Sequence, residues 1–578
     1  MCGIAGVVSE VADPGLGPIA AVMRDAISHR GPDAAGLFTD AAGCALGFRR
    51  LAIIDLVSGD QPMTTADGRS TVVFNGEIYN FAALRDELAG SHPFRTHSDT
   101  EVLLAGCASR GPAFISRLRG MFAFALWDAR ERRLLLARDR FGKKPLFWTR
   151  QGPRLYFASE LKALLRVLPA PETDPVGLVQ YLALGYLPRT RTIYRGIERL
   201  APGCTLSFAG GHVSVSRYWD LPLPDDRGPS DERAAAAWEE KIAPLLDEAV
   251  RLRLISDVPL GAFLSGGLDS STVVALALRH AARPFHTFSV RMEGGDRSDA
   301  DAAFAVSKLL GTTHHELVMG CPTPAEAVAV LGHLDEPFAD NSIFPTTAVS
   351  ALARAHVTVS LSGDGGDELF GGYGVYQLLE WYERLARIPL LRPAAALLAR
   401  AWPERARGHG FARRLGAAGG SRYIELVGHY LGAALERLTG DVLPKVDLAS
   451  MSRSLEVRAP LLDHLLAEAL ATLPADLRMR GGRGKLLLRR IALRHLPEAI
   501  VERKKQGFNV PIEAWLRGGL RPLVEEHLAA PGAAAASLLD PGELRRLSRP
   551  PATAEDGRLQ FTLLSLGVWA SNAARSPR

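Results

Sequence analysis

The sequence predicts two domains of different fold class: a strand-rich α+β domain first, and an α/β domain with a parallel sheet after it. Three observations predict this division. The 578 residues are too many for one hydrophobic core. Short β-rich runs separated by Gly, Asn and Asp turns dominate up to Trp219. Beyond a Pro-rich stretch, helical segments rich in Ala, Leu and Arg alternate with short apolar strands, a pattern typical of a parallel sheet with crossover helices.

The individual elements follow from local composition. In the first part, β-rich runs predict strands at 69–74, 121–127, 134–139 and 155–158, and helical periodicity predicts helices at 80–88 and 100–108. In the second part, continuously apolar runs predict strands at 258–264, 285–290 and 357–361. The stretch 221–230 is polar and Pro-rich, so it is the predicted linker. We therefore place the domains at 1–220 and 236–578, with a linker at 221–235.

Bulk composition restricts the class of protein. Apolar residues make up 47% and charged residues 23%, the profile of a soluble globular chain. The net charge of +5 comes from Arg spread along the chain, so we expect no nucleic-acid partner. No apolar run is long enough to span a membrane, and no signal peptide precedes the first strand. The five cysteines are widely separated and form no C-x-x-C pair, which argues against a disulfide framework or a zinc site and favours a cytoplasmic location.

The second residue carries the most chemical information. Removal of Met1 would leave Cys2 with both a thiol and a free α-amino group. An amine with a reference pKa of about 7.7–8.0 can take the proton of a thiol with a reference pKa of about 8.5. The same logic activates an N-terminal Thr. Taken alone, Cys2 is equally well explained as an incidental small residue in the first strand.

A glycine-rich turn follows the apolar run 258–264. It reads SGGLDSS over residues 265–271, and a helix is expected to begin there with Ser270, Ser271 and Thr272 as capping candidates. Backbone N–H groups, hydroxyls and a helix N-terminus at one place bind phosphate. The loop lacks the Gly-Lys-Ser/Thr of a Walker A motif, and Asp269 inside an anion site calls for a cation, most naturally Mg²⁺ shared with pyrophosphate. The alternative is an ordinary glycine turn that caps a helix.

Two further clusters complete the set of chemical motifs. The turn at 362–373 holds three carboxylates among five glycines, and it follows another apolar strand. Because functional loops of an open α/β sheet gather at the carboxyl ends of its strands, this turn could face the first across one ATP, with Asp269 and Asp367 as metal ligands. The basic loop at 503–511, with Lys505, suits stabilisation of developing phosphate or oxyanion charge. A solvated acidic turn and ordinary surface lysines are the alternatives.

Together these motifs resemble the glutamine-dependent asparagine synthetases of the bacterial type, over nearly the whole chain. The resemblance implies an N-terminal-nucleophile αββα sandwich in the first domain, as in class II glutamine amidotransferases. It implies a Rossmann-like ATP pyrophosphatase domain with many helices in the second.

The N-terminal motifs of that family are matched at HRGPD (29–33), RRLAIID (49–55), NGEIYN (75–80) and SDTE (98–101). The resemblance implies that Cys2 is the nucleophile and that Asn75 and Gly76 form the oxyanion hole. It implies that Arg50 pairs with the α-carboxylate of glutamine and Asp99 with its α-ammonium. The full glutamine-binding set that it implies is Arg50, Leu51, Ile53, Ile54, Asn75, Gly76, Glu77 and Asp99.

For the second domain the resemblance implies a catalytic Lys505 and further active-site segments at 335–342, 455–460 and 484–485. The implied ATP-binding residues are Phe263, Leu264, Ser265, Gly266, Gly267, Asp269, Ser270, Val290, Ser362 and Gly363. Asp364, also implied to be catalytic, stands where well-studied members carry Glu. Its charge is kept but its reach is one methylene shorter, as in a subgroup that includes sporulation-type and pathway-specific synthetases.

The expected activity is ATP-dependent amidation of aspartate through β-aspartyl-AMP, with ammonia from glutamine and Mg²⁺ as cofactor. The family also implies an interdomain ammonia tunnel and a possible homodimer. One alternative keeps both chemistries but amidates another carboxylic acid, such as a sugar acid, a peptide or an antibiotic precursor. A β-lactam synthetase type is disfavoured because it lacks the N-terminal Cys, and a catalytically silent homologue is disfavoured because no motif residue is lost.

Overall fold

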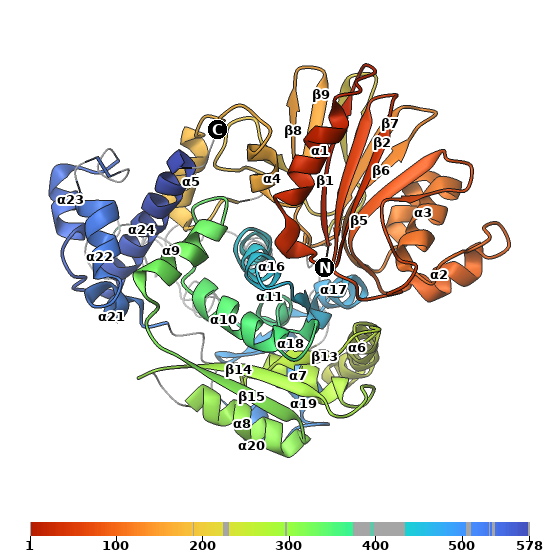
Figure 1. The fold of residues 1–578 in the computed structure, drawn as a ribbon. Helices are drawn as coiled ribbons and strands as arrows, with labels where there is room; N and C mark the ends of the chain where they lie inside the picture. Colours follow the sequence, from red (N-terminus) through yellow and green to blue (C-terminus); the bar gives the residue numbers. More distant parts are fainter. Residues whose placement is uncertain are drawn as a thin grey trace.

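We describe the fold from a computed structural model of the chain (Figure 1). The structure describes residues 2–188, 190–222, 230–294, 298–373, 434–503, 510–530, 532–533 and 538–575, and also positions 394 and 397. All statements below concern these residues.

The first part of the chain is an antiparallel sandwich of two six-stranded sheets. The first sheet has the order β10-β8-β9-β1-β3-β2, and the second has the order β12-β11-β7-β6-β5-β4. The strands of the first sheet are β1 (Gly3–Ser9), β2 (Ala34–Asp40), β3 (Cys44–Arg50), β8 (Phe147–Gln151), β9 (Arg154–Ala158) and β10 (Glu198–Arg199). Those of the second are β4 (Met63–Thr64), β5 (Ser70–Ile78), β6 (Gly120–Asp128), β7 (Arg133–Arg138), β11 (Cys204–Ala209) and β12 (His212–Arg217).

Helices cover both outer faces of this sandwich, which gives the predicted αββα layering. Helices α1 (Leu16–Asp25) and α4 (Leu161–Leu165) pack on the first sheet, and α2 (Phe81–Leu88) and α3 (Asp99–Arg110) lie over the second. Strand β1 shows why the central strands are apolar on both faces. Its Ile4 and Val8 point into the core between the sheets, whereas Ala5 and Val7 pack toward α1.

The second part is built on a parallel sheet with the order β15-β14-β13-β16-β17. The strands are β13 (Leu260–Phe263), β14 (His286–Met292), β15 (Thr313–Met319), β16 (Val359–Leu361) and β17 (Glu456–Arg458). Their crossovers include α7 (Leu268–Ala277), α8 (Ser298–Leu310), α9 (Pro324–His333) and α10 (Ile343–Arg354). The strand order reverses between β13 and β16, and ligands of open α/β sheets bind at such a switch point. We call this sheet with its helices the α/β domain.

The prediction of many helices in the α/β domain is confirmed. Its other helical segments are α6 (Glu232–Leu252), α11 (Gly366–Phe370), η3 (Leu438–Val442), α16 (Leu443–Met451), η4 (Pro460–Leu462), α17 (His464–Ala471), α18 (Ala475–Arg478), α19 (Leu486–Ala492), α20 (Glu498–Val501), α21 (Ile512–Arg517), α22 (Arg521–Val524), η5 (Glu525–Ala529), α23 (Pro541–Leu547) and α24 (Ala554–Arg575). A small hairpin of β18 (Met479–Arg480) and β19 (Arg483–Gly484) lies between α18 and α19 in the chain. The domain limits stay predictions, and α6 begins inside the range predicted as a linker.

The last helix returns to the sandwich. Helix α24 lies beside α5 (Pro175–Leu184) in Figure 1. The Tyr181 hydroxyl of α5 donates to the carbonyl of Thr562 at 2.7 Å, and Trp569 packs with the apolar residues under the first sheet. The sandwich and the α/β domain are therefore joined by packing as well as by the chain.

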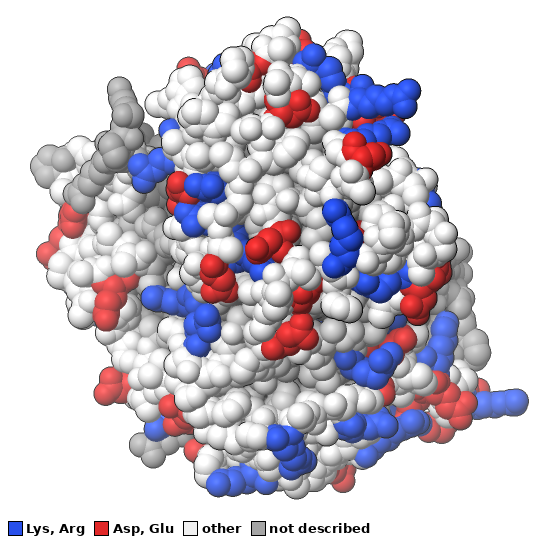
Figure 2. Space-filling view, turned by 45° about the vertical axis from the view of Figure 1, so that its right-hand side comes forward, with Lys and Arg blue, Asp and Glu red and all other residues white. Residues whose placement is uncertain are grey.

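The strands and helices predicted from the sequence are found within a few residues of their expected limits. One local prediction is wrong: helix α7 begins at Leu268 after the N-cap Gly267, so Ser270 to Thr272 lie inside its first turns and do not cap it. The five cysteines are free, as expected. Among the described helices, none has the length and apolarity needed to cross a bilayer. Basic and acidic side chains are interspersed on the face seen in Figure 2.

Candidate active sites

Cys2 lies directly before the central strand β1, at the junction of the sandwich and the α/β domain (Figure 1). Its backbone nitrogen, which becomes the α-amine once Met1 is removed, donates to Asn75 Oδ1 at 3.2 Å. Its Sγ lies 3.8 Å from the carbonyl oxygen of Leu51. Burial raises the pKa of the Cys2 thiol to about 11. The thiol therefore needs a base beside it before it can act as a nucleophile.

Asn75 and Gly76 are neighbours in β5, and Asn75 contacts the backbone nitrogen of Cys2. Asn75 is fully buried in β5, and because its Oδ1 faces the Cys2 nitrogen, its Nδ2 points elsewhere and donates to no described residue. Gly76 has a φ of 154°, and a Cβ there would lie 2.0 Å from the Met121 carbonyl, so only glycine fits. A buried, unused N–H beside a nucleophile is the arrangement that stabilises an oxyanion.

The end of β3 and the loop after it carry the predicted glutamine-binding residues: Arg50 closes the strand, and Leu51, Ile53 and Ile54 follow it. The Arg50 guanidinium is held inside this loop, where it donates to the carbonyl of Asp55 at 2.6 Å and to Asp60 Oδ1 at 2.8 Å. Leu51 and Ile53 are buried against Val359 of β16, with Ile54 partly buried in the same cluster. The loop is therefore supported by the sheet of the α/β domain.

The remaining predicted glutamine-binding residues, Glu77 and Asp99, lie close to Asn75 and Gly76. Asp99 is the first residue of α3, and its Oδ2 accepts a hydrogen bond from the Ile78 N–H at 2.9 Å. Burial raises the pKa of Asp99 to about 6. The Glu77 carboxylate faces Arg458 of the α/β domain, with Nη2 and Oε1 3.4 Å apart. The structure thus gathers β5, the start of α3 and Cys2 at one place.

Buried charges complete this site, some from the matched segments 29–33 and 455–460, and two, Glu160 and Asp447, from outside every motif. The Arg30 Nε donates to the Cys2 carbonyl at 3.1 Å, while its Nη1 donates to Glu160 at 2.7 Å and to Asp447 of α16 at 2.8 Å. Arg458 also donates to Glu456 at 2.6 Å. Glu160 and Asp447 lie far from Cys2 in sequence and belong to no local pattern, so only the fold reveals them.

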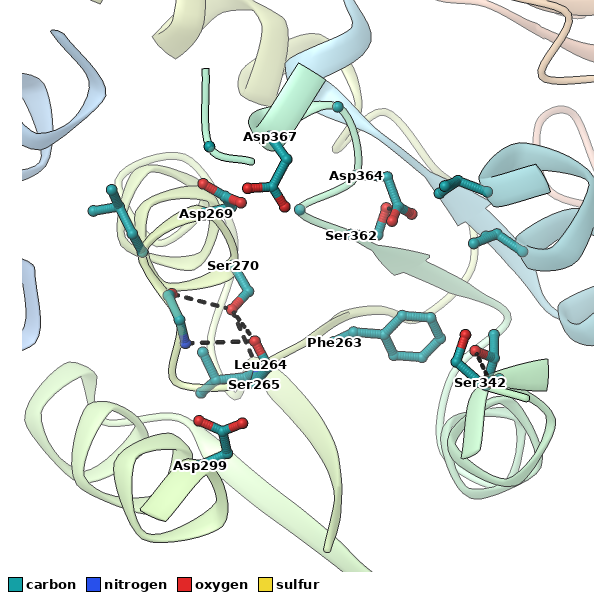
Figure 3. A pocket seen from close by; sticks show the side chains of 18 of the residues that line it. Phe263, Leu264, Ser265, Asp269, Ser270, Asp299, Ser342, Ser362, Asp364 and Asp367 are labelled. Carbon is teal, nitrogen blue, oxygen red and sulfur yellow. Dashed lines mark hydrogen bonds between the residues drawn. The ribbon is translucent and has the colours of Figure 1, made fainter. Parts of the chain in front are cut away.

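A cavity of about 1050 Å³ opens at the carboxyl edge of the parallel sheet (Figure 3). It is as large as the upper end of typical ligand pockets. Asp364, Asp367 and every predicted ATP-binding residue except Gly266 line it: Phe263, Leu264, Ser265, Gly267, Asp269, Ser270, Val290, Ser362 and Gly363. Lys505 lies outside the described residues. Its neighbour Arg503 pairs with Asp299 at 2.5 Å at the rim of the cavity.

The phosphate-type loop is ordered by its own hydroxyls. The Ser265 and Ser270 Oγ atoms are 3.1 Å apart, and the Ser265 N–H donates to Ser270 Oγ at 3.2 Å (Figure 3). The acidic loop meets it directly, because a Cβ on Gly363 would lie 2.9 Å from the Ser270 nitrogen. The two glycine-rich turns therefore face each other across the switch point, as the sequence predicts.

The carboxylates of Asp269 and Asp367 point toward each other (Figure 3) and converge on one ammonium group. Lys485 Nζ lies 2.7 Å from Asp367 Oδ1 and also bonds to Asp269. Despite burial, these two carboxylates hold the pKa of Lys485 above its usual value. Two carboxylates aimed at one cationic position fit the oxygen-ligand preference of Mg²⁺. Asp364 lies apart, where its Oδ2 accepts a hydrogen bond from Ser362 Oγ at 2.7 Å and burial raises its pKa.

The fold and the two sites define a two-domain glutamine amidotransferase with an N-terminal-nucleophile sandwich and an ATP pyrophosphatase domain. Comparison with family models agrees: residues 1–219 match the glutamine amidotransferase domain and residues 241–571 match asparagine synthase. The chain belongs to the asparagine synthase family.

The chain is 34% identical to asparagine synthetase [glutamine-hydrolyzing] 1 of Bacillus subtilis, over 91% of this chain and 89% of the relative. It is 34% identical to a putative glutamine-hydrolysing asparagine synthetase of Mycobacterium bovis, over 98% and 97% of the two chains. A third relative, named amidase chyE of Penicillium rubens, is 34% identical over 61% of this chain and 54% of its own. ATP is a substrate of asparagine synthetases.

Proposed function

We propose that this protein is a glutamine-hydrolysing asparagine synthetase that converts aspartate, glutamine and ATP into asparagine, glutamate, AMP and pyrophosphate. The observation that carries the proposal is the position of helix α16. Its Lys445 and Val446 line the nucleotide cavity, and its Asp447 binds Arg30, which holds the carbonyl of Cys2. One helix therefore contacts both sites, as expected of a protein that passes ammonia from one to the other.

The first reaction takes place at the sulfur site. The Cys2 amine accepts the thiol proton, and the thiolate attacks the side-chain carbonyl carbon of glutamine. The negative charge that forms on the carbonyl oxygen is stabilised by Asn75 Nδ2 and the Gly76 N–H. Ammonia leaves, and water then hydrolyses the thioester to glutamate. Arg50 and Asp99 bind the α-carboxylate and α-ammonium groups of the substrate, for which Arg50 exchanges its contact with Asp60.

The second reaction takes place in the cavity. A carboxylate oxygen of the acceptor attacks the α-phosphorus of ATP, and pyrophosphate departs against the 265–271 loop and the N-terminus of α7. Lys485 stabilises the charge of the departing phosphates, and we assign the same role to Lys505. Mg²⁺, when bound by Asp269 and Asp367, supplies further neutralisation of pyrophosphate. Ammonia then attacks the carbonyl of the acyl-adenylate, and AMP leaves.

Charges in the cavity support an amino acid as the acceptor. Lys445, whose pKa is held up by Asp340 and Asp441 despite burial, offers a cation for an α-carboxylate. It donates to Asp340 at 2.8 Å and to Ser342 at 2.7 Å. Asp364 and Glu368 line the same cavity and offer carboxylates for an α-ammonium. Aspartate carries both groups, so it matches this pattern.

A second candidate is a pathway-specific member of the same family that amidates a different carboxylic acid. Two observations favour it: Asp364 is one methylene shorter than the Glu of well-studied members, and one relative is named an amidase. A homodimer and a cytoplasmic location are proposed on the family resemblance alone.

The test is a complete product analysis of the purified protein with Mg²⁺, ATP, glutamine and aspartate. We expect asparagine, AMP and pyrophosphate in equal amounts, and ammonium salts should replace glutamine as the nitrogen source. Intact glutaminase activity without asparagine would favour the other carboxylic acid. Formation of ADP and phosphate would contradict acyl-adenylate chemistry altogether.

A further inference from the structure

Three histidines converge at the amino edge of the parallel sheet, at the opposite ends of the strands from the nucleotide cavity. His286 is the first residue of β14, His315 is the third residue of β15, and His356 follows α10. Strand register pairs Phe288 with His315, and His286 precedes Phe288 by two residues, so both side chains lie on the face that α10 covers. The sequence argument against a zinc site rested on cysteines, and these histidines are too far apart in sequence to form a motif.

The distances within this cluster are those of potential metal ligands. One nitrogen from each ring lies within 4.8 Å of the other two, and His286 Nδ1 is 3.0 Å from His315 Nε2. Tetrahedral zinc with Zn–N bonds of about 2.0–2.1 Å needs nitrogens roughly 3.3 Å apart. The closest pair already meets this requirement. The His356 ring stacks on His315 with centroids 3.9 Å apart, and because His356 is exposed it can rotate to complete the set.

The neighbouring His314 differs from these three histidines, because both of its ring nitrogens have hydroxyl partners. Its two ring nitrogens lie 3.0 Å and 3.1 Å from the hydroxyls of Thr287 and Ser289. The other three histidines face one another and Phe288, and none pairs with a carboxylate among the described residues.

We propose that His286, His315 and His356 bind one divalent transition-metal ion, with zinc as the best-matched ion, and that water fills the fourth position. Three histidines and a water are a recurrent zinc ligand set. The ion would join β14, β15 and the end of α10, and so stabilise an edge of the sheet away from the reacting atoms. A second group, formed by His29, Glu160 and His333, does not suit a cation, because Glu160 already binds Arg30 and Lys162.

The test is zinc binding to the tag-free full chain after treatment with a chelator. The Cys2→Ala background removes the thiol of the sulfur site as a competing ligand. We expect equilibrium dialysis with metal analysis to find one zinc per chain, and zinc to raise the thermal unfolding midpoint. His356→Ala and His315→Ala should each weaken zinc binding by more than about tenfold, since loss of even an outer partner of a zinc ligand costs that much. Both should also lose the zinc-dependent rise in midpoint.

The matched control is His212→Ala, an exposed histidine on β12 of the sandwich, which should bind zinc like the unsubstituted chain. His356 is exposed, so its alanine variant should fold even if His315→Ala does not. Equal zinc affinity in His356→Ala and His212→Ala would overturn the proposal. So would the absence of retained zinc in the Cys2→Ala chain, in which case the three rings are only an aromatic stack.

Discussion

The two active sites differ in which parts of the chain build them. Within the described residues, the nucleotide cavity is lined only by residues of the α/β domain, from Phe263 to Arg503. The sulfur site is built from both parts: Arg30 connects the Cys2 carbonyl to Asp447, and Arg458 faces Glu77. The cavity should therefore keep its shape without the sandwich, whereas the sulfur site depends on docking of the two domains.

This difference has a chemical consequence. Arg458 reaches both sites, because its side chain faces Glu77 while its backbone carbonyl accepts from the Ser362 N–H of the acidic loop at 2.8 Å. Burial, with Glu456, raises the pKa of Glu77, and the cation of Arg458 opposes that rise. Arg458 thus connects the Glu77 carboxylate to the acidic loop, so we expect the charge balance of the sulfur site to depend on docking of the α/β domain.

The largest effect is expected from removal of the Cys2 thiol, which tests whether the two sites act separately. Cys2→Ala should lower glutamine-dependent asparagine formation by about 10⁴-fold or more, since removal of a nucleophile eliminates the covalent route. Ammonia-dependent formation should stay within about twofold of the unsubstituted chain, because Cys2 does not line the nucleotide cavity. Assays with each nitrogen source in turn measure both. Loss of both activities in a folded variant would show that the sites are not separable in this way.

The reverse experiment targets the cavity. Asp269→Asn keeps the shape of the side chain but removes the charge that faces Lys485, and it should lower pyrophosphate release by about 10²- to 10³-fold. Glutamate formation from glutamine should persist, because Asp269 lines the nucleotide cavity, whose described lining belongs to the α/β domain. A coupled pyrophosphate assay and a glutaminase assay on the same preparation provide the comparison. Unchanged pyrophosphate release would contradict the role of this carboxylate.

Arg458→Leu tests the contact between the sandwich and the α/β domain. The change leaves Glu77 and Glu456 buried without their cation, so it should cost about 3–5 kcal/mol of unfolding free energy. In folded Arg458→Leu, glutaminase activity should fall by about 10²-fold, since small misplacements in a site cost that much. Ammonia-dependent synthesis should fall less. Arg117→Leu is the control, because its ion pair with Glu87 is exposed and contributes little to stability. Equal losses in both activities would contradict the asymmetry between the sites.

The local geometry of both candidate sites is contained in short stretches of sequence. Asn75 and Gly76 are adjacent in one strand, and the 265–271 loop follows directly from β13, so short motifs contain their geometry. The parallel sheet with crossover helices followed from the alternation of helices and strands, whereas its strand order is known only from the structure. Motifs also placed the acidic loop opposite the phosphate-type loop, where the structure has it.

The contacts between distant segments were not predicted. Arg30 and Asp447 are 417 residues apart, and Lys485 lies between two carboxylates from separate loops. Buried ion pairs of this kind follow no periodicity, because each partner is chosen by the fold and not by its neighbours in sequence. The three histidines at the sheet edge were missed for the same reason.

A smaller effect is expected from pH at the sulfur site. Because Asp99 has a pKa raised to about 6, its carboxylate becomes protonated as pH falls through 6, and the α-ammonium of glutamine then loses its partner. The affinity of the Cys2→Ala chain for glutamine should therefore fall by about tenfold from pH 7 to pH 5. Asp99→Asn should bind glutamine weakly at every pH. Folding raises this pKa, so the charged form costs stability at pH 7, and Asp99→Asn should keep or raise the unfolding midpoint. A flat profile between pH 7 and 5 would show that Asp99 does not hold the substrate.

The smallest effect is expected at Asp364, and it tests which carboxylic acid the cavity accepts. Asp364→Glu restores the longer carboxylate of well-studied members without changing the charge, and the Ser362 hydroxyl that donates to Asp364 remains. If aspartate is the acceptor, kcat/KM for aspartate should change by less than about tenfold, the low end of what one methylene is worth in a substrate pocket. Asp364→Ala, which removes the charge, should lower kcat/KM for aspartate much more. Comparison of the two variants separates the effect of the carboxylate's charge from the effect of side-chain length. A gain of asparagine synthesis in Asp364→Glu from an enzyme that otherwise makes none would identify Asp364 as the residue that fits the cavity to a different acid.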